Sequence, residues 1–318
     1  MHYRVLGRTG LRVSEVGFGA WAIGGPAKLG DLEIGWGEVD DAMSLRAIDA
    51  AYDAGVTFFD TADAYGAGRS ETLLGKAFKA KRDRVVIATK GGNRTVDGRW
   101  LKDFSKGWIR EALDASLARL GMDYVDLYQL HSPTDTADYR DETFEALEAL
   151  TARGKIRHYG VSVGPAAHGP WVIRNTRAAT IQVVYNLLER EPESELLPLA
   201  HAQGVGIIAR VPLASGFLTG KFTADVTFPG TDHRARTYSP EKIRQIVEGV
   251  AKLKFLTEGR HKTLAQAALQ YCLFHPAVSA VIPGAKTPEQ ARANAAASDG
   301  VLLTADEVTR ARAALAGG

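Results

Sequence analysis

The chain has 318 residues, 45% hydrophobic and 24% charged, a balance typical of globular proteins with a large buried core. Its 39 basic and 37 acidic residues are mixed along the chain and leave a formal charge of +2, which argues against nucleic acid or a membrane as a partner. A single cysteine excludes an internal disulfide, and no stretch resembles a targeting core or the roughly 20 apolar residues of a membrane span, so we expect a cytoplasmic protein.

Short runs rich in β-branched residues alternate along the chain with amphipathic stretches of helical length. A small hairpin is expected first, because Arg-Thr-Gly marks a turn within the first ten residues. Eight strand candidates then follow, at residues 14–19, 56–59, 85–89, 124–130, 156–162, 181–184, 205–209 and 278–282. Helical patterns separate them, for example over 44–55, 107–121 and 143–154, and each of these ends in glycine.

This alternation predicts parallel strands joined by helices, which either close into a barrel or form an open doubly wound sheet. The spacing is even and no linker divides the chain, so we predict an α/β protein: one (β/α)8 TIM barrel domain over residues 1–318, with an N-terminal β-hairpin. Residues 24–41, 91–104 and 222–239 are too long for tight connections. We expect extended loops there, at the C-terminal face of the barrel.

The first glycine-rich motif resembles a dinucleotide-binding turn in its spacing but not in its context. Gly17, Gly19 and Ala22 match the G-x-G-x-x-A spacing of a dinucleotide-binding turn. That turn must open a helix whose amides face a pyrophosphate, whereas residues 22–38 are rich in glycine and lack a helical period. We therefore do not interpret the match as a Rossmann fingerprint.

Four polar residues follow the ends of three apolar strands: Asp60, Tyr65, Lys90 and His131. Taken singly, Asp60 is most simply a turn or cap residue, Tyr65 a half-buried aromatic and His131 a structural histidine. Lys90 is less ordinary, because a lysine at the end of a buried strand needs a carboxylate partner or an aqueous cavity. In a closed barrel all four positions fall on the same C-terminal rim, so we interpret them together as a catalytic site.

The chemistry of these four side chains is complementary. A phenol has a reference pKa of about 10, and an adjacent ammonium lowers it by stabilising the phenolate. Lys90 would supply that ammonium, Asp60 would hold it by an ion pair, and Tyr65 would donate the proton. His131 would donate a hydrogen bond to the substrate oxygen and polarise a carbonyl group.

Other chemistries find little support in the sequence. A zinc enzyme lacks ligands, because there is one cysteine, no H-E-x-x-H spacing and no histidine pair at helical ligand spacing. No G-x-S-x-G turn offers a serine nucleophile. No metal is expected, because a cofactor can supply the hydride while protein donors stabilise the developing charge.

The chain resembles the aldo-keto reductases nearly from end to end. The resemblance rests on LGRTGLRVSEVGFGAW, GVTFFDTADAYG, RVVIATKGG, DYVDLYQLHSP, GKIRHYGVS, IQVVYNLLER, VPLASGFLTGK and VIPGAKTPEQARAN. It implies an eight-stranded barrel, a nicotinamide cofactor that is usually NADPH (NADP+ when oxidised), and reduction of aldehydes or ketones. Trp21, Tyr65 and His131 would then contact the substrate, and Trp36 and Trp100 are further pocket candidates.

The resemblance also implies a cofactor-binding set. Ser162 and Gln182 match positions that hold the nicotinamide carboxamide, the loop ending at Lys221 matches the one over the pyrophosphate, and Lys286 matches the adenosine segment, where a cation favours NADPH. The full set is Ala20, Trp21, Asp60, Ser162, Gln182, Arg210, Pro212, Leu213, Ser215, Gly216, Leu218, Lys221, Gly284, Lys286, Gln290 and Asn294.

Two positions depart from the pattern of many members. Val163 stands where asparagine would bind the carboxamide, and Arg210 stands where an aromatic residue would stack on nicotinamide, as in a bacterial-type subgroup. A guanidinium can also stack on a flat ring. We expect a monomer acting on a small-molecule carbonyl substrate. Two alternatives stay open: a cofactor-binding subunit of the potassium-channel type, and a sugar or polyol dehydrogenase that uses NAD in the oxidising direction.

Overall fold

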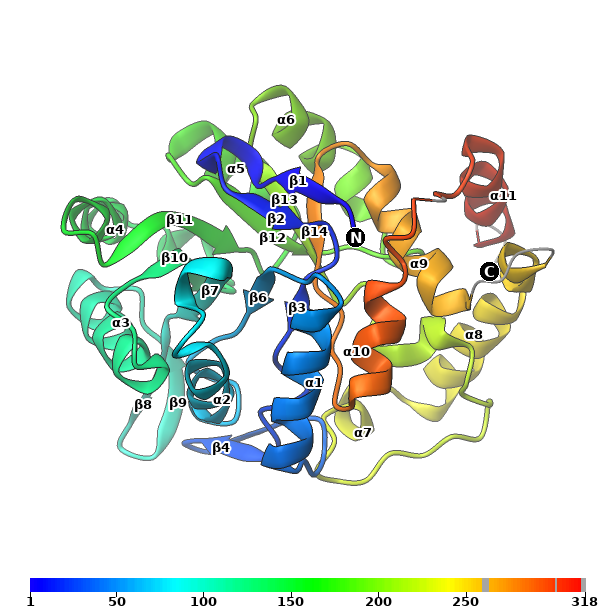
Figure 1. Cartoon of the computed structure of the whole chain (residues 1–318), viewed down its shortest axis with the longest axis horizontal. Helices are drawn as coiled ribbons and strands as arrows, with labels where there is room; N and C mark the ends of the chain where they lie inside the picture. The colour runs from blue at the N-terminus through cyan, green and yellow to red at the C-terminus, as the bar shows by residue number, and fades with distance from the viewer. Residues whose placement is uncertain (259–262, 301, 316–318) are drawn as a thin grey trace.

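The computed structural model describes residues 1–258, 263–300 and 302–315, and its centre is a barrel of eight parallel strands (Figure 1). In spatial order the strands are β3 (Phe18–Gly19), β6 (Phe58–Asp60), β7 (Val86–Gly91), β10 (Val125–His131), β11 (Ile156–Ser162), β12 (Thr180–Val184), β13 (Gly206–Arg210) and β14 (Val278–Val281). Two parallel bridges, Val16 to Val281 and Gly19 to Gly284, bring the first strand against the last. These bridges close the sheet, so the predicted barrel is confirmed over the open alternative.

Helices surround the barrel and alternate with its strands. They are α1 (Asp41–Asp53), α2 (Arg69–Phe78), α3 (Lys106–Leu120), α4 (Asp141–Ala152), α5 (His168–Asn175), α6 (Leu196–Ala202), α9 (Leu264–Phe274) and α10 (Pro288–Ala295). Three more, α7 (Arg234–Thr237), α8 (Pro240–Ala251) and α11 (Ala305–Leu315), are additions, and α8 and α11 lie to one side of the ring in Figure 1. Within the described part of the chain, no helix combines the length and the apolar character needed to span a bilayer.

Local sequence signals explain where the helices begin and end. The Asp40 carboxylate caps α1 by accepting a hydrogen bond from Met43 N at 2.6 Å, and the Ser105 hydroxyl caps α3 in the same way. Helix α3 ends where Gly121 turns into the left-handed region, at φ 63°. The caps at Asp40 and Ser105 thus end the connections from β3 to α1 and from β7 to α3.

The barrel interior changes from apolar to polar along its strands. Near the N-terminal end a buried cluster gathers one residue from each of five strands with two from the N-terminal hairpin: Phe58, Ala88, Leu127, Ile208, Ala280, Leu6 and Val13. Successive strand side chains alternate between faces, so the residues two positions later point inward as well. On four of these strands they are Asp60, Lys90, Gln129 and Arg210. Polar side chains therefore converge at the C-terminal end of the barrel.

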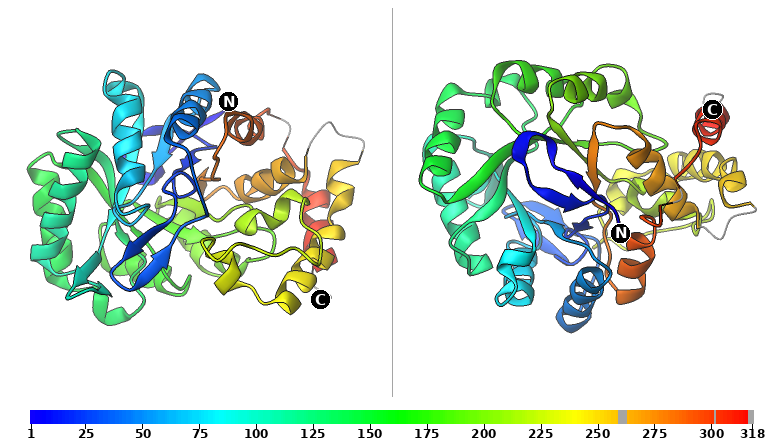
Figure 2. Two further views of the ribbon diagram at one scale, coloured as in Figure 1. Left: turned by 90° about the horizontal axis from the view of Figure 1, so that it is seen from below. Right: turned by 45° about the horizontal axis from the view of Figure 1, so that its top comes forward.

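The N-terminal hairpin covers the opposite end of the barrel. Strands β1 (Tyr3–Val5) and β2 (Arg12–Ser14) pair antiparallel, and Figure 2 shows the hairpin lying across the barrel opening. The hairpin packs closely against the start of β13, because a Cβ at Gly7 (φ 52°) would lie only 2.1 Å from Gly206 N. The expected strand 14–19 is divided: Ser14 pairs with Tyr3 in the hairpin, and the barrel strand keeps only two residues.

Two of the three predicted long loops contain hairpins. Strands β4 (Ala27–Leu29) and β5 (Leu32–Ile34) form one, and β8 (Asn93–Val96) and β9 (Arg99–Lys102) form the other. Their turn residues, Gly30-Asp31 and Asp97-Gly98, are dipeptides typical of tight hairpins, a sequence signal that would have predicted both. The hairpins meet where Trp100 N donates to Asp31 Oδ1 at 3.0 Å. The third segment holds α7 and a bridge from Asp232 to Trp36.

Candidate active site

Three of the four predicted rim residues form one hydrogen-bonded group inside the barrel mouth. Lys90 Nζ donates to Asp60 Oδ1 at 2.5 Å and to the Tyr65 hydroxyl at 3.1 Å, and its third hydrogen bond goes to Thr61 O at 2.8 Å. The Lys90 side chain is fully buried and that of Asp60 is 2% exposed. An ammonium has three donors, so every one of them has an acceptor.

The second oxygen of Asp60 is held by two glutamines. Gln129 Nε2 donates to Asp60 Oδ2 at 3.1 Å, and Gln182 Nε2 donates to it at 2.9 Å. Gln182 was expected to bind cofactor; here it also fixes the carboxylate. Gln129 was missed in the sequence, although its inward direction follows from its place two residues before His131 on β10. The carboxylate cannot turn away from Lys90 without losing these bonds.

Burial and charge act in opposite directions on the protonation of Lys90 and Tyr65. Burial lowers the pKa of Lys90, but Asp60 and Tyr65 more than offset this and leave that pKa above its usual value. Burial raises the pKa of Tyr65 above its usual value, although the Lys90 ammonium acts to lower it. Tyr65 is therefore a neutral phenol beside a charged ammonium, and proximity to Lys90 alone does not bring its pKa below the reference value.

Tyr65 owes its position to a tight loop between β6 and α2. Gly66 (φ 63°) follows it, and a Cβ there would lie 2.1 Å from Gly24 O. The Tyr65 loop and the segment at Gly24 thus pack backbone against backbone, which only glycine permits. On its other side, the Tyr65 ring stacks on Trp21 with centroids 5.8 Å apart.

His131, the fourth rim residue, lies at the end of β10 next to Tyr65. Its ring meets the Tyr65 ring edge to face, with centroids 5.6 Å apart. Burial lowers the pKa of His131 well below its usual value, and the cations Lys102, Lys90 and Arg210 lower it further. The imidazole is therefore neutral, with one N–H to donate. The structure brings all four predicted residues together.

A long cleft of about 800 Å³ runs across this group. Most of the predicted cofactor and substrate residues line it: Trp21, Asp60, Tyr65, His131, Ser162, Gln182, Arg210, Pro212, Leu213, Ser215, Gly216, Lys221, Gly284, Lys286, Gln290 and Asn294. Two do not, because the side chains of Ala20 and Leu218 are buried in the hydrophobic core. The catalytic Lys90 is also absent from the lining, because it is fully buried under Tyr65. Ala20 and Leu218 thus meet the cleft at most through their backbone.

The segment expected at the adenosine also lines the cleft. Lys286 Nζ donates to Trp36 O at 2.6 Å, and Gln290 Oε1 accepts from Lys286 N at 2.8 Å. Asn294 Nδ2 donates to Gly284 O at 3.1 Å. These bonds tie α10 and the preceding turn to the segment that follows the β4–β5 hairpin.

Arg210 and Val163, the two departures from the family pattern, contact each other. Arg210 Nη2 donates to Val163 O at 3.3 Å, and the Val163 side chain is fully buried in the core. Arg210 Nε is buried and meets no hydrogen-bond partner among the described residues. A buried donor without a partner is costly, so this atom is a candidate contact for a ligand in the cleft.

Apolar side chains wall the cleft above Tyr65 and His131. They come from the barrel and from both hairpins: Trp21, Leu29, Leu32, Ile34, Trp36 and Trp100. The two that the sequence placed here only as candidates, Trp36 and Trp100, are thus on the cleft. The β4–β5 leucines and isoleucine were missed, because the segment was predicted only as an extended loop at this face and no pattern showed which of its side chains point into the cleft.

One cation at the cleft was also missed. Arg234, on α7, pairs with Asp232 at 2.6 Å and donates to Ser215 O at 3.1 Å, so it anchors the 222–239 segment to the predicted pyrophosphate loop.

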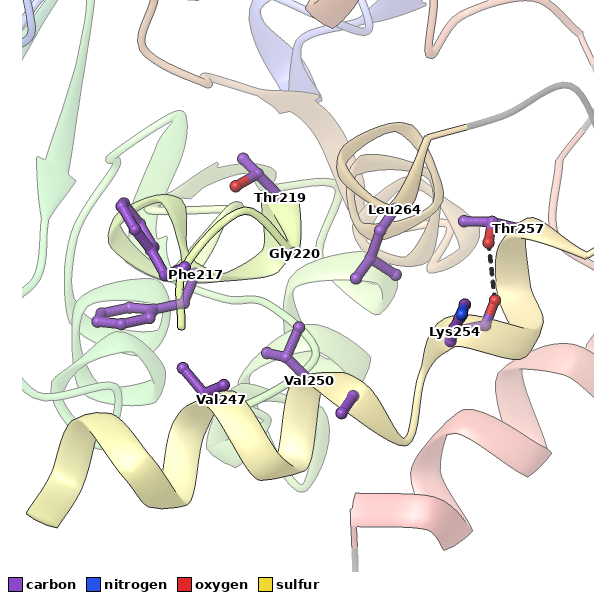
Figure 3. Close-up of a pocket in the computed structure, with 10 residues that line it drawn as sticks. Phe217, Thr219, Gly220, Val247, Val250, Lys254, Thr257 and Leu264 are labelled. Atoms are coloured by element: carbon purple, nitrogen blue, oxygen red, sulfur yellow. Dashed lines mark hydrogen bonds between the residues drawn. The ribbon is translucent and has the colours of Figure 1, made fainter. Parts of the chain in front are cut away.

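A smaller hollow of about 430 Å³ lies behind the predicted pyrophosphate loop, between Phe217 and the helices α8 and α9 (Figure 3). Lys254 is the one titratable residue among the described residues that line this hollow, which therefore offers no acid and base pair.

Comparisons with known proteins agree with this geometry. The model of the Aldo/keto reductase family matches residues 15–316. The uncharacterized oxidoreductase YqkF of Bacillus subtilis is 37% identical, over 97% of this chain and 94% of its own length. The NADH-specific methylglyoxal reductase of Escherichia coli is 33% identical over 95% and 94%. A probable voltage-gated potassium channel subunit beta of Oryza sativa is 34% identical over 97% and 94%.

Solved structures give the same result. The holo form of the aldo-keto reductase AKR11C1 from Bacillus halodurans superposes with a TM-score of 0.82, at 33% identity over 99% of this chain and 96% of its own. An aldo/keto reductase from Klebsiella pneumoniae, solved with NADP and acetate, has a TM-score of 0.73 at 28% identity, over 98% and 94%. The match spans the barrel and the residues gathered at its mouth. This chain therefore belongs to the aldo-keto reductase family and is an oxidoreductase that acts on carbonyl compounds.

Proposed function

We propose that this chain is an NADPH-dependent reductase that converts aldehydes or ketones to alcohols, with Tyr65 as proton donor. The observation that carries the proposal is the place of Lys90 Nζ, 2.5 Å from Asp60 and 3.1 Å from the Tyr65 hydroxyl, beneath the floor of a long cleft. A phenol held against a buried ammonium is suited to give up a proton and to be left as a stabilised phenolate.

The residues of the cleft fit a phosphorylated dinucleotide. Lys221, Arg234 and Lys286 line it, and Asp60, already paired with Lys90, is the one acidic residue among its described lining residues. The unpartnered Arg210 Nε lies at the end expected to hold nicotinamide, beside Ser162 and Gln182. When bound, the nicotinamide supplies the hydride. Leu213, Ser215 and Gly216 would face the pyrophosphate, and Lys286, Gln290 and Asn294 the adenosine.

The chain's own groups act on the carbonyl oxygen. Tyr65 is a neutral phenol that gives its proton to that oxygen as charge develops on it, and Lys90 stabilises the phenolate that remains. Asp60 keeps the ammonium in place. His131 donates a hydrogen bond from its neutral ring to the same oxygen and polarises the carbonyl.

The apolar side chains that line the cleft indicate which class of carbonyl substrate it binds. Tryptophans and aliphatic side chains from the two hairpins, among them Leu29, Ile34 and Trp100, surround the space above Tyr65. We therefore propose aldehydes and ketones with an aromatic or aliphatic substituent over sugar phosphates. With NADPH, the kcat/KM for a benzaldehyde should exceed that for glyceraldehyde 3-phosphate; the reverse order would contradict the assignment.

Replacing Tyr65 by Phe tests the proton donor. The variant should lose at least about 100-fold in kcat, which is the scale of general acid catalysis, and keep its NADPH affinity by fluorescence titration. Tyr52→Phe, on α1 and outside the cleft, is the matched control. Undiminished aldehyde reduction by the Tyr65 variant would refute the proposed mechanism.

Lys286→Ala tests the cofactor. We expect it to weaken NADPH binding far more than NADH binding, because its ammonium would face the 2′-phosphate. One relative, the methylglyoxal reductase, is named as NADH-specific, so a preference for NADH is the alternative to test. A preference for NADH that the substitution leaves unchanged would favour an NAD-dependent enzyme, including one that oxidises sugars or polyols.

The channel subunit relative sets the second test. Tight NADPH binding without turnover across a panel of aldehydes would point to a cofactor-binding subunit instead of an enzyme. Steady NADPH consumption supports our proposal. The monomeric state and cytoplasmic location stay predictions, and size-exclusion chromatography tests the first.

A further inference from the structure

A cluster of polar side chains lies behind His131, outside the acid and base group. It consists of Asp63, Asn93 and Lys102, and we call it the Asn93 cluster. Asn93 and Lys102 stand opposite each other on the β8–β9 hairpin, while Asp63 follows β6. Asn93 is at its centre and bonds to both other members and to His131. None of its three members was predicted from the sequence.

The direction of the Asn93 amide follows from its partners. Its oxygen accepts from Trp100 Nε1 at 3.2 Å and from Lys102 Nζ at 2.9 Å. An indole N–H and an ammonium can only donate, so the atom they face must be the carbonyl oxygen. A flipped amide would set its NH₂ group against two donors and lose both bonds. The amide nitrogen therefore points the other way.

The amide nitrogen reaches two acceptors. Asn93 Nδ2 lies 3.0 Å from Asp63 Oδ1 and 3.0 Å from His131 Nδ1. An NH₂ group has two hydrogens, and each has one partner here. A donor facing His131 Nδ1 requires that this ring nitrogen carry no proton. The ring is neutral because burial keeps its pKa low, so its single proton must lie on Nε2.

We propose that Asn93 is a positioning residue that holds His131 in the Nε2–H tautomer, so that the ring presents a donor to the carbonyl oxygen in the cleft. The role in catalysis rests on the proposed reductase function; the tautomer does not. Lys102 anchors the arrangement, because its ammonium also donates to His131 O at 2.6 Å and so links the hairpin to the end of β10. The opposite tautomer would set a lone pair against the substrate oxygen and repel it.

A charge-conserving swap, Asp63→Asn with Asn93→Asp, tests the proposal. It exchanges amide and carboxylate within the cluster, so the volume and net charge stay the same and Lys102 and Trp100 keep an acceptor. A carboxylate oxygen then faces His131 Nδ1 and draws the ring proton to it. We expect the ¹⁵N shifts of the His131 ring to change from the Nε2–H to the Nδ1–H or imidazolium pattern. We also expect kcat to fall about 100-fold or more, the scale of a lost oxyanion donor, with little change in KM for NADPH.

The controls separate positioning from folding. His131→Gln identifies the His131 resonances among those of the eight histidines by their loss. Asp63→Asn alone keeps the Asn93 amide and should keep the Nε2–H pattern, while Thr95→Val, exposed on the same hairpin, should leave both spectrum and activity unchanged. Circular dichroism verifies that each variant is folded.

Two results would overturn the proposal: a native His131 that already shows the Nδ1–H or imidazolium pattern, or a folded swap variant that keeps the Nε2–H pattern. Failure of the proposed function looks different. A native chain that reduces no carbonyl compound, yet changes its His131 tautomer on the swap, would refute the reductase assignment and support the role of Asn93.

Discussion

The buried pair of Lys90 and Asp60 makes a quantitative prediction about stability. Both side chains are almost fully removed from water and lie 2.5 Å apart. Lys90→Met leaves the Asp60 carboxylate buried with only two glutamine donors, and Asp60→Asn leaves the ammonium buried without an opposite charge. An uncompensated buried charge costs about 3–5 kcal/mol, which corresponds to a fall in Tm of roughly 6–15 °C for a protein of this size.

The double variant should recover much of that loss. With Asp60→Asn and Lys90→Met together no charge is buried, and the amide oxygen introduced by Asp60→Asn can still accept from the two glutamines. We expect a coupling free energy of about 2–4 kcal/mol between the two changes. Carbonyl reduction should stay abolished, because the ammonium beside the Tyr65 hydroxyl is gone. Stability and activity would thus be separated in one protein.

The assay is thermal unfolding of the four proteins, followed by circular dichroism alongside aldehyde reduction. The exposed pair of Lys155 and Asp114, with side chains 38% and 56% exposed, supplies the matched control. The same substitutions there, Lys155→Met and Asp114→Asn, should each cost no more than about 1 kcal/mol. Single changes at Lys90 and Asp60 that cost equally little, and that add in the double variant, would refute the reasoning from burial.

Three further predictions concern the barrel ends and the Asn93 cluster. Gly7→Ala should lower the Tm, because its Cβ would lie 2.1 Å from Gly206 N and displace the hairpin, whereas Gly10→Ala meets no atom within 4 Å; equal effects would contradict the packing. Phe58→Ala should cost about 3–5 kcal/mol in urea unfolding, since its side chain is fully buried at the base of the barrel, and a cost below about 1 kcal/mol would contradict that. Burial raises the pKa of Asp63 to about 6, so ionised Asp63 opposes folding above that pH, and the opposition fades as the pH falls from 6 toward 3.8. Asp63→Asn should therefore gain up to about 3 kcal/mol relative to the native chain at pH 7.5 and much less at pH 4.5; thermal melts that differ equally at both values would refute this.

Residues at strand ends could be placed from the sequence, because the carboxyl ends of parallel strands meet at one rim of a barrel. Asp60 and His131 end their strands and Lys90 is the last but one residue of its strand, and the structure brings the three together with Tyr65. The same reasoning could not reach Asn93, because it lies not at the end of a barrel strand but on β8, in a hairpin that we predicted only as an extended loop. Its part in the site depends on contacts with Trp100 and Lys102 that only the folded hairpin creates.

The sequence by itself determined the alternation of strands and helices, which follows from local periodicity, and the polar residues at the strand ends. The tertiary structure decided that the sheet closes into a barrel, through the bridges from Val16 to Val281 and from Gly19 to Gly284, and which side chains contact the four rim residues. Gln129 and Gln182 reach Asp60 from 69 and 122 residues away, and Asn93 reaches His131 from 38. Such contacts depend on strand register and hairpin packing, which no local sequence pattern records. Only the tertiary structure therefore shows which nitrogen of His131 is protonated and which side chains hold the Asp60 carboxylate.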